Sequence, residues 1–210
     1  CGVGAQTITL AQRSAGARLI SVDRSTESLA AARRLIEGAG LTNVEFQHGD
    51  LFALPYPKAS FDHVFVCFVL EHLSQPVKAL LALKKLLKRG GTMTVIEGDH
   101  DSAYFHPDSA AAREAIDCLV TLQARAGGNS LIGRQLYPLL TQAGFNDVRV
   151  TERPVYVDGS RPDLIDGFTR KTFTAMIEGV REPALAAGLM SAERFDQGIR
   201  DLCRTAAPDG

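Results

Sequence analysis

Two hydrophobic patterns alternate along the first hundred residues. Short runs of β-branched and other apolar residues, typical of strands, are separated by segments in which apolar positions recur every three or four residues, as on one face of a helix. The predicted strands are Arg18–Val22, Val44–Gln47, Phe61–Phe68 and Thr92–Ile96. Predicted helices precede the first strand and follow the first and third strands. Because parallel strands are joined by such crossovers, the pattern predicts a mostly parallel sheet with helices on both faces.

Residues that start and stop helices support this division. Ser25 or Thr26 is placed to cap the second helix. Pro76 begins the helix after the third strand, and Gly90-Gly91 is expected to end it. The third strand is apolar almost throughout, which is typical of a strand buried on both faces.

After Glu97 the pattern becomes mainly helical. Helical spacing predicts helices at residues 108–126, 134–143, 162–180 and 191–206, with one further strand near residues 147–157 that Pro154 interrupts. We therefore expect a single domain with two halves. Residues 1–100 form the sheet, and residues 101–210 form a helical half that covers the carboxyl edge of that sheet.

Composition and charge narrow the classes of function. The 210 residues are 45% hydrophobic with a formal net charge of −1, which fits a soluble domain and provides no basic surface for nucleic acid. The longest apolar run, Val64–Leu70, is far too short to span a membrane. The four cysteines are scattered without a Cys-x-x-Cys pair, which indicates reduced thiols in a cytoplasmic protein.

The chain opens with a glycine pair beside its first predicted helix. Gly2-x-Gly4 leaves backbone N–H groups at the helix N-terminus, which favours an anionic ligand group. Asp23 ends the next strand, where its carboxylate can bind both hydroxyls of a ribose or instead cap the following helix. A nicotinamide dinucleotide and S-adenosylmethionine both fit this layout. Thr7 stands where a nicotinamide site prefers a third glycine, and the chain has no Tyr-x-x-x-Lys pair.

A resemblance to a known family decides between these ligands. The ordered blocks CGVG, SVDRSTESLAAARR, HGDLFALPYPKASFDHVFVCFVLEHL and LLKRGGTMTVIEGD resemble the signature of class I S-adenosylmethionine-dependent methyltransferases. They resemble most the small-molecule branch that includes quinone-biosynthesis enzymes. The resemblance covers residues 1–100 and implies a Rossmann-like doubly wound fold. It also implies methyl transfer from S-adenosylmethionine to a small organic acceptor by in-line displacement. The near-zero charge and the short apolar runs separately predict no nucleic-acid or membrane partner.

The resemblance also assigns cofactor-binding residues. It places Gly2 and Gly4 under the methionine part, Asp23 at the ribose, Asp50 and Leu51 at the adenine, and Arg24 and Phe68 near the cofactor. In this family a central strand precedes the glycine loop and an antiparallel strand ends the sheet. We therefore expect the 210 residues to be an internal piece of a longer chain that lacks both strands.

Residues 97–106 are rich in acidic, histidine and aromatic side chains. They follow the fourth strand at its carboxyl end, where such sheets bind ligands. Some acceptors need a base, for which Glu97, His100 and His106 are the candidates. Tyr104 and Phe105 are expected to line the acceptor pocket or attract the sulfonium through their ring faces. The order of acids and histidines matches no metal motif, so no metal is expected.

His72, which follows the third strand, is a further candidate for the acceptor pocket, although a structural role fits it as well. Two other functions stay open. One is a nicotinamide-dependent oxidoreductase on a related sheet. The other is a methyltransferase-like fold that serves as a non-catalytic binding or scaffold subunit, because displacement chemistry requires no nucleophile on the protein.

Overall fold

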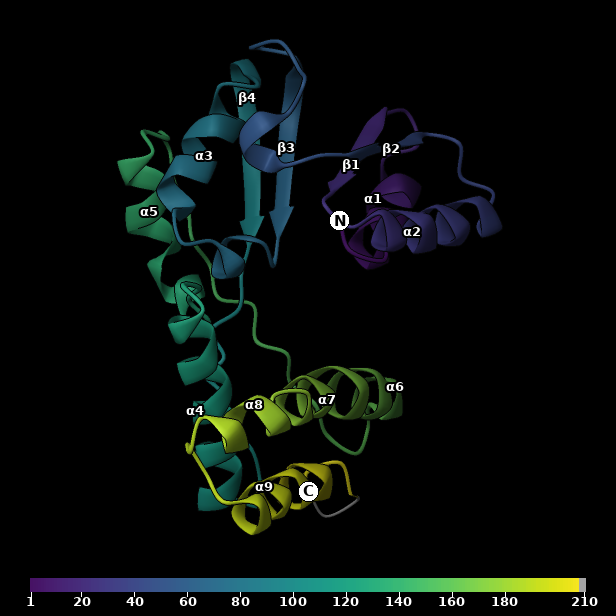
Figure 1. The fold of residues 1–210 in the computed structure, drawn as a ribbon. Coiled ribbons are helices and arrows are strands. Elements are labelled where there is room, and N and C mark those ends of the chain that lie inside the picture. Colours follow the sequence, from purple (N-terminus) through teal and green to yellow (C-terminus); the bar gives the residue numbers. More distant parts are fainter. Residues whose placement is uncertain (208–210) are drawn as a thin grey trace. The chain divides into compact units, whose positions relative to one another are not determined.

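The computed structural model describes residues 1–207, which divide into two compact units (Figure 1). The first comprises Cys1–Cys67 and Val77–Ile96, and the second comprises Phe68–Pro76 and the residues from Glu97 onward. The predicted change of pattern after Glu97 therefore lies close to the boundary between the units. The short segment Phe68–Pro76, which sequence reasoning assigned to the sheet-forming half, belongs with the helical unit.

The first unit begins with two parallel strands and two helices. The elements are α1 (Ala5–Arg13), β1 (Leu19–Asp23), α2 (Thr26–Gly38) and β2 (Val44–His48), and Leu19 pairs with Val44 in the parallel register. Helix α2 buries Leu29, Ala32 and Ile36, which recur at helical spacing. Ser25 caps this helix, as predicted: its Oγ accepts a hydrogen bond from Ser28 N at 3.1 Å.

The same unit contains a second parallel pair. Its elements are the 3₁₀-helix η1 (Leu51–Ala53), β3 (Phe61–Cys67), α3 (Pro76–Lys84) and β4 (Leu87–Ile96). The prediction that Gly90-Gly91 ends the helix is wrong, because both glycines lie inside β4. The Leu86 carbonyl already accepts hydrogen bonds from Ser60 and Phe61 N, so pairing with β3 begins there. Gly90, with φ of 78°, lies where the register shifts.

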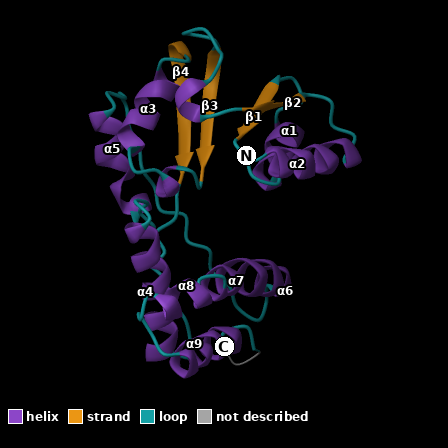
Figure 2. Ribbon diagram, in the orientation of Figure 1, coloured by secondary structure: helices purple, strands orange, loops and turns teal. Residues whose placement is uncertain are grey.

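Strand β3 is less buried than its apolar sequence predicted. Only Val66 of this strand is buried, because β3 pairs with β4 alone within residues 1–207. The two parallel pairs, coloured as strands in Figure 2, share no strand-to-strand hydrogen bonds in this part of the chain. The expectation of burial on both faces is therefore wrong for the described residues.

The second unit is helical and contains a hydrophobic core. After the 3₁₀-helix η2 (Leu70–His72) it contains α4 (Ala110–Arg125), η3 (Ile132–Gln135), α5 (Leu136–Gln142), α6 (Pro162–Leu164), the π-helix η4 (Ile165–Thr174), α7 (Ala175–Glu178), α8 (Arg181–Ala186) and α9 (Ala192–Arg204). Ile116, Ile177 and Phe195 are buried together in this core. The predicted helices are confirmed, with residues 162–180 divided by the π-helical segment.

The strand predicted near residues 147–157 does not form within the described chain. A strand needs a neighbour for its ladder of hydrogen bonds, and Pro154 has no N–H to donate. Val150, Val155 and Tyr156 are exposed, so burial does not compensate. Among residues 1–207, no helix is long and apolar enough to cross a membrane.

Candidate functional site

The glycine loop lies where the chain turns into α1. Gly4 is the residue before the helix and has φ of 89°, a left-handed conformation that favours glycine. A Cβ on Gly4 would lie 3.0 Å from the Cβ of Ala32 on α2, so a side chain there would press against the neighbouring helix. Both the backbone conformation and the close approach of α2 therefore require glycine at this position.

Asp23 ties this loop to the end of β1. Its Oδ2 accepts hydrogen bonds from Gly2 N at 2.7 Å and from Cys1 N at 2.8 Å, and its Oδ1 accepts one from Ser25 N at 2.9 Å. Asp23 therefore orders the turn into α2, although Ser25 is the cap. A carboxylate offers about four acceptor positions. Three are used here, so one position on Oδ1 is left for a ligand hydroxyl.

These hydrogen bonds make stability depend on the charge of Asp23. Partial burial raises the pKa of Asp23, but hydrogen bonds from the backbone N atoms of Cys1, Ser25 and Gly2 outweigh it and lower the pKa to about 2. Because the folded-state pKa lies below the ordinary 3.8, the contribution of Asp23 is fully present above pH 3.8 and is lost as the pH falls toward 2. We expect the difference in melting temperature between wild type and Asp23→Asn to shrink over that interval in thermal melts.

Asp163→Asn is a matched control, because the Asp163 side chain is 72% exposed. A wild-type advantage over Asp23→Asn that is the same at neutral pH and near pH 2 would contradict the assignment.

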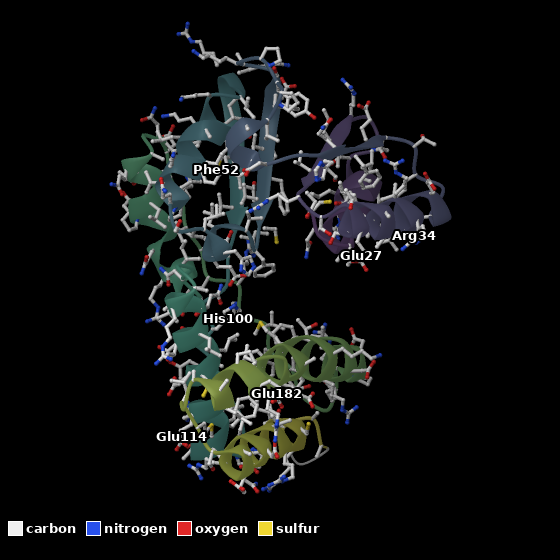
Figure 3. All side chains as sticks on the ribbon, viewed as in Figure 1. Glu27, Arg34, Phe52, His100, Glu114 and Glu182 are labelled. Atoms are coloured by element: carbon white, nitrogen blue, oxygen red, sulfur yellow. The ribbon has the colours of Figure 1, made fainter. Side chains whose placement is uncertain are left out.

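The predicted adenine residues also lie in the first unit. Asp50 caps η1, and its Oδ1 accepts a hydrogen bond from Phe52 N at 2.9 Å. Leu51 lines an open pocket between this segment and α3, together with Phe52, whose position Figure 3 labels. Arg24 is exposed, and its carbonyl lies 3.0 Å from the Nε2 of His48. The cofactor roles of these residues stay predictions.

The second unit brings together two carboxylates, the buried Glu71 and the partly buried Glu97. Glu97, just after β4, accepts backbone hydrogen bonds from Val69 N at 3.0 Å, Leu70 N at 2.9 Å and Glu71 N at 3.3 Å. Burial raises the pKa of Glu97, the three backbone hydrogen bonds lower it, and the nearby Glu71 charge raises it again, with a raised pKa as the result. Glu97 therefore holds the segment that begins η2, and both of its oxygens are engaged.

Glu71 pairs with His100, a residue labelled in Figure 3. The Oε2 of Glu71 lies 3.0 Å from the Nε2 of His100, and only 7% and 15% of the two side chains are exposed. Burial raises the pKa of Glu71, but the hydrogen bond and charge of His100 outweigh it and lower the pKa. Sequence reasoning missed Glu71. The available signal was an acid beside His72 in LEHL, directly after a strand.

Three of the other predicted acceptor-side residues, His72, Tyr104 and His106, are exposed. The Nε2 of His72 lies 3.6 Å from the Oε1 of Glu71, and the His72 side chain is 66% exposed. Phe105 packs against the helical core, with the Arg113 guanidinium 5.0 Å from its ring centroid.

Phe68 has φ of 50°, a conformation that is rare for a bulky residue, and its side chain is half exposed. The acceptor-side roles of His72, Tyr104, Phe105 and His106, and the cofactor role of Phe68, stay predictions.

Residues 1–95 match the methyltransferase domain family. This region of the chain is similar in sequence to methyltransferases. Demethylmenaquinone methyltransferase of Thermus thermophilus is 36% identical over 96 residues, which cover 46% of this chain and 43% of that protein. The predicted resemblance to quinone methyltransferases is therefore confirmed.

One curated relative and one solved structure are similar to this chain beyond residues 1–95. An uncharacterized 37.1 kDa protein in transposon Tn4556 of Streptomyces fradiae is 34% identical over 190 residues, which cover 89% of this chain and 53% of that protein. The chain thus spans about half the length of these curated relatives.

The crystal structure of a S-adenosylmethionine-dependent methyltransferase from Aquifex aeolicus aligns with a TM-score of 0.55 at 22% identity, over 72% of this chain and 71% of that one. This structural match confirms the Rossmann-like fold predicted for the chain.

Proposed function

We propose that the protein binds S-adenosylmethionine and transfers its methyl group to a small organic acceptor by in-line displacement. The observation that carries this proposal is the match of residues 1–95 to the methyltransferase domain family. The formal net charge of −1 favours a small acceptor over nucleic acid. The scattered cysteines favour the cytoplasm as the compartment.

The glycine loop and Asp23 fit such a cofactor. Gly2 has φ of 54°, and a Cβ built on it meets no atom within 4 Å, so the space beside this backbone is open to a ligand. The remaining acceptor position on Asp23 suits a ribose hydroxyl, and the loop before α1 suits a carboxylate. When bound, the cofactor supplies a methyl group on a cationic sulfonium. The protein supplies orientation and, for a protic acceptor, a base.

Asp23→Ala is expected to weaken S-adenosylmethionine binding by ~1–3 kcal/mol, or roughly 5- to 150-fold, the typical loss of a hydrogen bond to a charged group. Isothermal titration calorimetry measures this change. Asp62→Ala is the matched control in the same unit, because the Asp62 carboxylate is 85% exposed and pairs with Lys88. Equal affinities of wild type and Asp23→Ala would exclude Asp23 from the cofactor site.

A separate experiment tests whether the protein transfers the methyl group to an acceptor. Candidate metabolite pools are incubated with the protein and isotope-labelled S-adenosylmethionine, and mass spectrometry then searches for a labelled methylated product. Such a product would identify the acceptor as well as the activity. Cofactor binding without any product across a broad pool would instead favour the non-catalytic binding subunit, and stabilisation by a nicotinamide dinucleotide alone would favour the oxidoreductase.

A further inference from the structure

We infer that Glu71 is a positioning residue for His100: it holds the ring proton on Nε2 and leaves Nδ1 as the atom that accepts a proton. This inference deepens the proposed function, because it rests on His100 as the candidate base. Nothing in the sequence pattern had singled out Glu71 for this role.

The hydrogen-bonding capacity of the two groups leads to this assignment. An ionised carboxylate only accepts hydrogen bonds, so the Nε2 that lies 3.0 Å from Glu71 Oε2 must be the donor. A neutral imidazole carries a single N–H, which leaves the lone pair on Nδ1. The pair is largely buried, so water competes little for the Nε2 proton.

Glu71 is itself held in place through its backbone. Its carbonyl accepts hydrogen bonds from Asn129 N at 2.7 Å and from Gln123 Nε2 at 3.1 Å, and its N–H donates to Glu97. His100 is fixed from the same side, because its N–H donates to the Ser130 carbonyl at 3.0 Å. The loop of residues 127–130 therefore holds both members of the pair, and such rigid support favours a fixed proton position over a mobile ion pair.

The other base candidates lack this arrangement. Both oxygens of Glu97 accept backbone hydrogen bonds, and the exposed His106 has no carboxylate partner among the residues described. His72 lies 3.6 Å from Glu71, beyond ordinary hydrogen-bond distance, and is mostly exposed. Among the candidate bases in residues 1–207, only His100 combines a largely buried side chain with a short contact to a carboxylate.

Atoms and charge are conserved in the proposed proton transfer. As the acceptor atom forms its bond to the methyl carbon, the sulfur–carbon bond breaks and its electron pair stays on sulfur. The O–H or N–H proton of the acceptor passes to Nδ1 of His100. The imidazolium then carries the positive charge that the sulfonium loses, and the Glu71 carboxylate stabilises it at Nε2.

The tautomer of His100 tests the inference directly. Protein labelled with ¹⁵N-histidine is studied by long-range ¹H–¹⁵N correlation at a pH where the rings are neutral, and His100→Gln identifies the signals of that ring. We expect one fixed tautomer with the proton on Nε2 and a slowly exchanging Nε2–H resonance. A wild-type ring protonated on Nδ1, or one that averages both tautomers, would overturn the inference.

Variants separate positioning from general packing. Glu71→Leu is expected to lose the protected Nε2–H resonance, whereas Glu71→Asp, which keeps the carboxylate, retains part of it. Glu114→Leu is the matched control, because Glu114 is a half-exposed carboxylate of the same unit that pairs with Arg194. If Glu71→Leu does not fold, the wild-type tautomer alone still decides. The readout needs no turnover, so failure of methyl transfer and failure of this inference are separate results.

Discussion

Replacing Glu97 with alanine is expected to destabilise the protein by roughly 3–5 kcal/mol, because several part-buried N–H groups each lose an acceptor worth about 1–3 kcal/mol. Glu97 accepts from the backbone N–H groups of Val69, Leu70 and Glu71. Alanine offers no acceptor to any of them. Urea denaturation gives the change in the free energy of unfolding, and amide hydrogen exchange at residues 69–71 localises it.

Glu97→Gln is the matched comparison. The donors Val69 and Leu70 both bond to Oε1, so a glutamine carbonyl in that position keeps two of the three hydrogen bonds. We expect a much smaller loss of stability than for alanine. Equal losses in the two variants, or unchanged exchange at residues 69–71, would contradict the role assigned to Glu97.

The Glu97→Ala effect is also expected to depend on pH. Burial raises the pKa of Glu97 above the ordinary 4.5, and the Glu71 charge raises it further. The backbone hydrogen bonds oppose only part of this increase. The stability that such a group contributes is fully present below pH 4.5 and declines as the pH rises through the raised value. The difference between wild type and Glu97→Ala should therefore shrink from acidic toward neutral pH.

Gly198→Ala is expected to lower the free energy of unfolding by roughly 2–3 kcal/mol, within the range typical of overpacked cores. A Cβ at this position of α9 would lie 2.5 Å from the carbonyl oxygen of Ala111 and 3.1 Å from the Cβ of Ala115, both on α4. Most of the atoms met belong to backbone, so relief requires the two helices to separate. The higher helix propensity of alanine, about 1 kcal/mol, offsets only part of this cost.

Gly38→Ala is the control that measures the effect of helix propensity without a packing change. Gly38 ends α2, and a Cβ there meets no atom within 4 Å. We expect this change to be neutral or to stabilise by about 0.5–1 kcal/mol. Thermal and urea unfolding of the two variants, side by side, separates packing from propensity. A Gly198→Ala protein as stable as wild type would show that α4 and α9 do not pack this closely.

The parallel pairs and most helices were predictable because their signals are local. Ser25 has the side chain to cap α2, and Leu29, Ala32 and Ile36 recur at helical spacing on one face. The strand predicted near Pro154 does not form in the described residues. Its signal was not sufficient, because a strand depends on a neighbour that its own sequence does not specify. The start of β4 was misplaced because its pairing with the start of β3 begins at the Leu86 carbonyl, before the glycines that the sequence pattern marked as a helix end.

The sequence by itself determined the similarity to methyltransferases, the alternation of strands and helices, and the position of the glycine loop and Asp23, because each is carried by adjacent residues or short, ordered spacing. Only the tertiary structure decided that Glu71 meets His100 and that Glu97 holds the backbone of residues 69–71. These partners lie 26 to 29 positions apart, and loop packing brings them together. Side-chain pairing across such a distance depends on how the chain folds back, which hydrophobic periodicity does not encode.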